Sequence, residues 1–139
     1  MRIHQENLEI ETRPRRLVDI TREVQAIVAR SGVASGLCSV FVRHTSAGLV
    51  IQENADPAVL RDLARWLEAL APESTSYEHD DEGPDDMPAH LRSVVTRTAE
   101  TIPVERGRLA FGTWQALYLY EHRARGRRRQ LAVSVIGDG

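Results

Sequence analysis

The strongest constraint on the fold of this chain is the order in which two kinds of apolar pattern follow each other. Segments rich in β-forming residues, whose side chains alternate between two faces, dominate the sequence. They cover residues 3–11, 36–44, 47–54, 98–104, 108–122 and 130–136. Two segments with a helical spacing of apolar residues lie between them, at 19–31 and 56–71. This order predicts an α+β fold with a mainly antiparallel, sandwich-like sheet arrangement and two main helices.

Local signals mark where the two helices begin and end. Asp19 and Thr21 both suit the N-cap of the first helix, and Gly32 is placed to end it. The second helix begins with Asp56 and Pro57, an N-cap acid followed by proline at the first helical position. We therefore expect each helix to pack in the core by one apolar face.

The connections lead to three further predictions. Segments 36–44 and 47–54 are close enough in sequence to form a hairpin, and the strands between 98 and 136 form a meander. Residues 73–90 lack periodicity and contain many turn formers, which is typical of a functional or mobile loop. With no internal repeat, residues 1–139 are expected to form one compact domain.

The composition excludes several classes of function. A net charge of −2, from 18 basic and 20 acidic residues, gives no overall field that attracts DNA or anionic lipid. Every basic residue is arginine, so Schiff-base catalysis by lysine is excluded. Cys38, the only cysteine, leaves no internal disulfide and is expected in the core. Because no secretory signal or membrane-spanning run is present, the expected location is the cytoplasm.

A first candidate site lies where the strand 36–44 ends. Cys38, Val40, Val42 and His44 share its inward face, so His44 stands where the core face meets the strand end. The next residues, Thr45-Ser46-Ala47-Gly48, offer hydroxyls and backbone N–H groups to an anion. A histidine satisfied at a hairpin turn is the simpler interpretation of the same pattern.

Two later strands carry a second group of polar residues. Glu53 continues an apolar row on the strand 47–54, and a carboxylate in such a position needs a cationic partner or a metal. Gln115 shares a row with Thr113 and Glu121, which fits a pocket lined by polar groups at both ends.

The most unusual stretch is acidic. Six of the nine residues from Glu78 to Asp86 are acidic, with His79 among them and His90 just after. Histidines and carboxylates together can hold zinc, magnesium or manganese, whereas an acidic run alone is usually a solvated surface. The arginines of 123–129 are interpreted as a solvated hairpin tip, because the patch is short and offset by the acidic run.

Several of these segments together resemble the YjbQ family, in an order and spacing that cover essentially the whole chain. They are His44-Thr45-Ser46-Ala47, Glu53-Asn54-Ala55-Asp56-Pro57, residues 82–91, Gly107-Arg108-Leu109, Gly112-Thr113-Trp114-Gln115 and Glu121-His122-Arg123. The resemblance implies a sandwich-like α+β domain that assembles as a homotrimer with sites near subunit boundaries. It also implies a secondary thiamine-phosphate synthase activity, which joins a pyrimidine-methyl diphosphate to a thiazole phosphate and releases pyrophosphate.

Residue roles follow from this resemblance. The residues expected to be catalytic are His44, His90, Glu53 and Gln115. The residues expected to bind substrate are Thr45, Ser46, Asn54, Arg92, Gly112 and Thr113. A divalent metal, magnesium or zinc, is expected at Asp86, Glu121 and His90. Arg92 stands where the family often has lysine, and arginine cannot be deprotonated as a lysine-dependent step would require.

Two other functions fit the same residues. One is a non-catalytic trimeric binder of a phosphorylated metabolite or a metal, and the other is a metal-dependent hydrolase using the loop rich in histidine and aspartate. Metal retained through purification would favour the hydrolase. The expected partners are further copies of this chain and a small phosphorylated metabolite, with no nucleic acid and no membrane.

Overall fold

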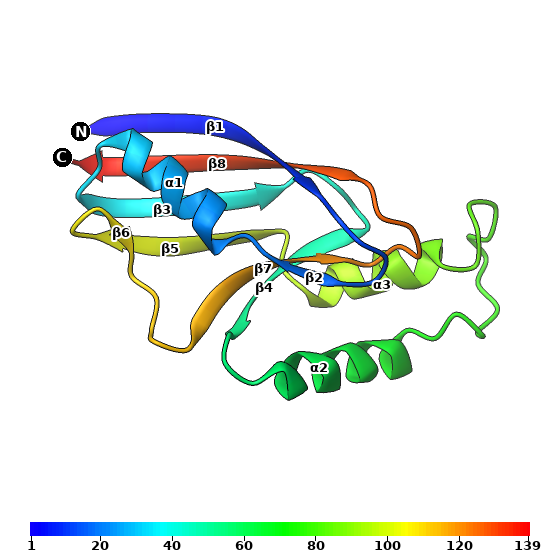
Figure 1. Ribbon diagram of the computed structural model, residues 1–139. Coiled ribbons are helices and arrows are strands. Elements are labelled where there is room, and N and C mark those ends of the chain that lie inside the picture. The colour runs from blue at the N-terminus through cyan, green and yellow to red at the C-terminus, as the bar shows by residue number, and fades with distance from the viewer.

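Two antiparallel sheets and three helices make up the computed structural model, which describes residues 1–139 (Figure 1). The larger sheet has the order β1-β8-β3-β5-β6, with β1 Arg2–Glu11, β8 Arg128–Asp138, β3 Ser35–Val42, β5 Ala99–Glu105 and β6 Arg108–Leu109. The smaller sheet has the order β2-β7-β4, with β2 Leu17–Asp19, β7 Gln115–Glu121 and β4 Ala47–Glu53. The helices are α1 Thr21–Ser31, α2 Pro57–Leu70 and α3 Asp86–Val95. The expected α+β class is confirmed.

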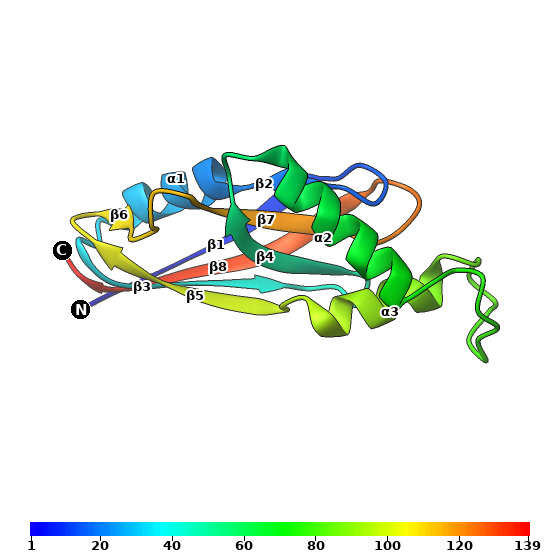
Figure 2. The same cartoon turned by 90° about the horizontal axis from the view of Figure 1, so that it is seen from below.

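The core lies between the larger sheet and a second layer formed by α1 and the smaller sheet (Figure 2). The expected inward face of β3 is confirmed, because Cys38, Val40 and Val42 are all buried. Burial raises the pKa of the Cys38 thiol to about 11, so this side chain is a protonated core residue and not a nucleophile. α1 contributes Val28 and Ile27 to the same cluster.

The local signals at the end of α1 and at the start of α2 are confirmed, but the N-cap of α1 is Ile20, without a side-chain cap hydrogen bond, and not Asp19 or Thr21. The side chain of Asp56 accepts a hydrogen bond from the Ala58 N–H at 2.9 Å, and Pro57 opens α2. At the end of α1, Gly32 adopts the left-handed conformation with φ 70°, which glycine reaches without strain. α2 and α3 cover the outer face of the smaller sheet, where Tyr118 and Tyr120 are buried (Figure 2).

The predicted hairpin and meander are wrong. β3 and β4 belong to different sheets. Instead of turning back toward β4, the residue after β3 still pairs with β8, because the Arg43 N–H donates to the Gln130 carbonyl at 3.1 Å. The predicted strand 108–122 is two strands, because residues 110–114 cross from the larger sheet to the smaller one. Among the late strands only β5 and β6 pair in sequence order.

A third helix replaces the last five residues of the predicted loop, 86–90. Residues 73–85 contain no helix or strand, but α3 begins at Asp86 and carries Pro88 in its first turn. Acidic residues and proline are typical both of turns and of a helix start, which is why this segment resembles a loop in the sequence. The helix places Asp86 and His90 one turn apart.

One face of the larger sheet has no covering element (Figure 2). Its outward side chains include Leu37, Phe41 and Ile136, which are 46%, 47% and 39% exposed. None of the three helices combines the length and the apolar character needed to cross a membrane.

Candidate metal and ligand site

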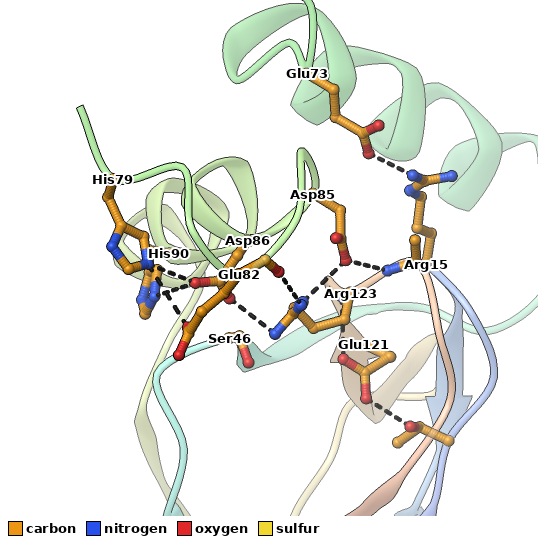
Figure 3. Close-up of polar contacts among 12 residues, drawn as sticks. Arg15, Ser46, Glu73, His79, Glu82, Asp85, Asp86, His90, Glu121 and Arg123 are labelled. Carbon is orange, nitrogen blue, oxygen red and sulfur yellow. Dashed lines mark hydrogen bonds and ion pairs between the residues drawn. The ribbon is translucent and has the colours of Figure 1, made fainter. Parts of the chain in front are cut away.

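α3 brings two of the expected metal ligands together and adds a third from the preceding loop (Figure 3). Asp86 and His90 are four residues apart and therefore lie on one face of the helix. The Asp86 Oδ2 atom lies 3.2 Å from His90 Nε2 and 2.7 Å from His79 Nε2. One ligand atom from each of the three residues lies within 4.8 Å of the other two. His79, the histidine of the acidic loop, thus completes a three-residue group, although it was not among the three residues expected to hold the metal.

Arg123 fixes the carboxylate of this group from the opposite side (Figure 3). Its guanidinium lies 2.8 Å from Asp86 Oδ1 and donates to Asp85 Oδ2 at 2.9 Å. The Ala124 N–H donates to the same Asp85 oxygen at 2.8 Å. Asp86 therefore has one oxygen on Arg123 and the other toward the histidines. The expectation that 123–129 is a solvated tip is wrong at both ends, because Arg123 is half-buried and Arg129 is buried.

The charges in the group favour an ionised carboxylate beside a protonated imidazole. Burial opposes ionisation of Asp86, but the hydrogen bond from His79 and the charge of Arg123 keep its pKa below the ordinary value. The hydrogen bond to Asp86 is the main cause that raises the pKa of His79. A metal ion binds neutral imidazole, so an incoming cation takes the place of a proton held between these groups.

A cavity of about 650 Å³ opens beside His90. It is lined by residues 41–45 and by four residues of α3 and the segment after it, namely His90, Ser93, Val94 and Thr98. The expected site residues His44, Thr45 and His90 therefore line one pocket, although 44–45 and 90 belong to different parts of the chain. His90 belongs both to this pocket and to the His79–Asp86–His90 group.

The protonation of His44 is set by the backbone. The Gln130 N–H donates to His44 Nε2 at 2.7 Å, so this nitrogen acts as an acceptor and only Nδ1 remains free. Burial, followed by the charge of Arg129, lowers the pKa of His44. A neutral His44 with its proton on Nδ1 can donate a hydrogen bond to a ligand, but its Nε2 is not available as a base.

Glu121 and Ser46 belong to a buried ion-pair network and not to the metal group. Glu121 is 0% exposed and pairs with Arg129, while Thr12 donates to its Oε1 at 2.6 Å. The same arginine donates to the Ser46 hydroxyl and carbonyl oxygens at 3.0 and 3.1 Å. Both residues are thus engaged in holding the sheets together, which leaves Glu121 no free oxygen for the expected metal.

Arg92 lies apart from the pocket because residues two apart on a helix point to nearly opposite sides. It is buried on the other side of α3 from His90 and donates to the Ala71 carbonyl at 2.9 Å. The structure therefore separates this residue from the others that were expected to bind substrate.

The remaining expected residues lie at the far end of β4, roughly 20 Å along the strand from Ala47 at about 3.3 Å per residue. Glu53 is paired with Gln115 across β4 and β7, and its carboxylate accepts the Asp56 N–H at 3.0 Å. The Gln115 side chain accepts the Gly112 N–H at 2.8 Å. The residues in this group are Glu53, Asn54, Gly112, Thr113 and Gln115. Within one chain they form a turn-stabilising group that is separate from the His44–His90 pocket.

Comparisons with known proteins agree with this architecture. The family model described as "UPF0047 protein YjbQ-like" matches residues 6–138. The UPF0047 protein sll1880 of Synechocystis is 54% identical over 99% of this chain and 94% of its own length. The UPF0047 protein YjbQ of Salmonella typhimurium is 38% identical over 97% and 99%. A crystal structure of a YbjQ-like protein from Sulfolobus solfataricus superposes with a TM-score of 0.90 at 28% identity, covering 98% of both chains.

The expected thiamine-phosphate synthase activity is wrong as an assignment. The family and these relatives are described without any such activity, and the Sulfolobus protein is described as one of unknown function. The resemblance seen in the sequence is confirmed for family and fold, and it does not extend to this reaction.

Proposed function

This chain belongs to the UPF0047 YjbQ-like family, and from that premise and its own residues we propose that it is a metal-binding protein. The ion is a divalent transition metal held by His79, Asp86 and His90. The adjoining His44–His90 pocket binds a small phosphorylated metabolite next to this ion. The observation that carries the proposal is the convergence of two imidazoles and one buried carboxylate within 4.8 Å, with His90 shared by the pocket.

The donor set favours zinc over magnesium. Two imidazole nitrogens and one carboxylate oxygen are the three protein ligands of many open zinc sites, whereas magnesium prefers oxygen ligands. Zinc–nitrogen distances of about 2.0–2.1 Å place neighbouring ligand atoms roughly 3.3 Å apart, close to the present spacing. The contact from Arg123 supplies the outer support that orients a ligating carboxylate.

The pocket has the chemistry of a small anionic ligand with an apolar body. Arg43 and the Thr45 hydroxyl can hold a phosphate, and Nδ1 of His44 adds a neutral donor. Phe41 and Val94 supply apolar wall. When bound beside His90, the ion would polarise an oxygen of such a ligand as a Lewis acid.

Removing either histidine is expected to weaken zinc binding by about 100-fold or more, beyond the roughly 10–100-fold effect of an outer-shell change. Isothermal titration with zinc at pH 7.5 would compare wild type with His79→Ala and His90→Ala. His4→Ala is the matched control, because His4 lies on β1 and pairs with Glu6. Zinc affinity unchanged in His90→Ala would show that this group is not the metal site.

We also propose that the chain self-associates as a homotrimer through the open face of the larger sheet. The exposed Leu37 and Phe41 on that face support this, since burial of apolar area drives association. Light scattering is expected to give three times the 15.6 kDa chain mass, and Leu37→Arg should lower it. Leu70→Arg, at an exposed position of α2, should leave the mass unchanged. A monomer at all concentrations would contradict the homotrimer. A cytoplasmic location is a further, separate part of the proposed function.

A further inference from the structure

Arg92 is a buried cation without an anionic partner. Only 4% of the residue is exposed, and its one side-chain hydrogen bond runs from Nη2 to the Ala71 carbonyl oxygen. Of all buried side-chain nitrogens and oxygens, only its Nε and Nδ1 of His122 have no partner. Because a buried charge without a counter-charge is strongly unfavourable, this guanidinium indicates a missing counter-ion.

A second cavity, separate from the His44–His90 pocket, adjoins this guanidinium. It has a volume of about 250 Å³ and is lined by Arg15, Glu68, Pro72, Glu73 and Arg92. Arg15 is already paired with Glu73 across the cavity (Figure 3). Glu68 is the only other acidic residue in the lining, and it forms no ion pair. The cavity is therefore lined by two guanidinium groups, by the carboxylate of Glu73, which Arg15 neutralises, and by the unpaired carboxylate of Glu68.

We propose that this cavity is a binding site for an inorganic oxyanion the size of phosphate, held by Arg92 from the core side and by Arg15 from the surface. Arginine is the side chain best suited to this role, because its planar donors match the oxygens of an oxyanion two at a time. The site is independent of the proposed metal, since Arg92 lies on the opposite side of α3 from His90.

Thermal unfolding with inorganic phosphate tests the proposal, with sodium chloride keeping the ionic strength constant. The melting temperature of wild type is expected to rise by about 3–5 °C at a tenfold excess over Kd. Arg92→Met should abolish this rise. Arg61→Met, which removes an exposed arginine of α2, should retain it, and so should Arg43→Met, which removes the arginine of the His44–His90 pocket. Retention in Arg43→Met separates this cavity from the pocket of the proposed function.

Glu68→Gln provides the second test and does not depend on the folding of the Arg92 variant. Its neutral side chain removes repulsion, so phosphate affinity by isothermal titration should increase several-fold. No phosphate-dependent rise in wild type, or a rise that survives in Arg92→Met, would overturn the proposal. Glu68→Gln that lowers the melting temperature and leaves phosphate affinity unchanged would also overturn it, because Glu68 would then be the counter-ion.

Discussion

Glu121→Gln is expected to lower the free energy of unfolding by about 3–5 kcal/mol, the usual cost of removing one partner of a buried ion pair. The carboxylate accepts hydrogen bonds from Arg129 and Thr12 in the interior, and one from the N–H of the half-buried Arg123. Glutamine has almost the same shape, so the substitution removes the charge with little change in volume. The guanidinium of Arg129 would stay buried without a counter-ion.

Urea unfolding provides the measurement, and Glu11→Gln is the matched control. Glu11 pairs with Arg128 on the surface nearby, at 3.4 Å, with both side chains mostly exposed. Exposed pairs contribute about 0–1 kcal/mol, so the control should change little. Equal effects of the two substitutions would contradict the assignment of Glu121 as a structural anion.

His122 is expected to make the protein lose stability as the pH falls below about 6.5. Burial is the main cause that lowers its pKa to about 3, and the charges of Arg92 and Arg129 add to it. In the unfolded chain a histidine takes up its proton near pH 6.5, so between these two values the unfolded state binds one more proton. Stability therefore falls by about 1.4 kcal/mol for each pH unit on acidification through this interval.

Urea titrations at intervals between about pH 7 and 4, in phosphate-free buffer, would compare wild type with His122→Gln. Glutamine keeps a polar group near Thr96, which contacts the histidine at 3.1 Å, but it does not titrate. The variant should show a shallower dependence on pH by about the same 1.4 kcal/mol per unit. Asp85→Asn serves as the control above about pH 5, where this carboxyl stays ionised in the folded and in the unfolded protein. Burial opposes its ionisation, but the hydrogen bond from Arg123 lowers the Asp85 pKa to about 2. Parallel curves for wild type and His122→Gln would contradict the prediction.

Features that depend on a few neighbouring residues could be predicted from the sequence, whereas the pairing of distant strands could not. Gly32 and the pair Asp56–Pro57 mark helix ends through their own conformational preferences. The alternation in residues 38–42 shows which side faces the core, but it carries no information on which strand lies alongside. β3 pairs with β5 and β8, which are far away in sequence, so nearness to β4 was misleading.

The candidate site shows the same division. The sequence indicated Asp86 and His90, but their four-residue spacing brings the side chains together only on a helix. The acidic run made this segment resemble a loop, so α3 was not predicted. His79 joins them because the loop 73–85 returns toward the helix, which no local pattern reveals. The sequence also could not show that Arg92 faces away from His90. It could not show that Glu53 and Gln115 lie at the opposite end of β4.

The pairing of β1 with β8 has a consequence for how the protein is made. β1 has no other partner in the sheet, and Arg2 lies opposite Gly137. During synthesis the hydrogen bonds between β1 and β8 therefore cannot form until more than a hundred further residues have been added to the chain. Non-local pairing of this kind closes long loops and slows folding. The charged and polar residues that alternate along β1 keep the waiting strand hydrated, so the larger sheet is completed only when β8 leaves the ribosome.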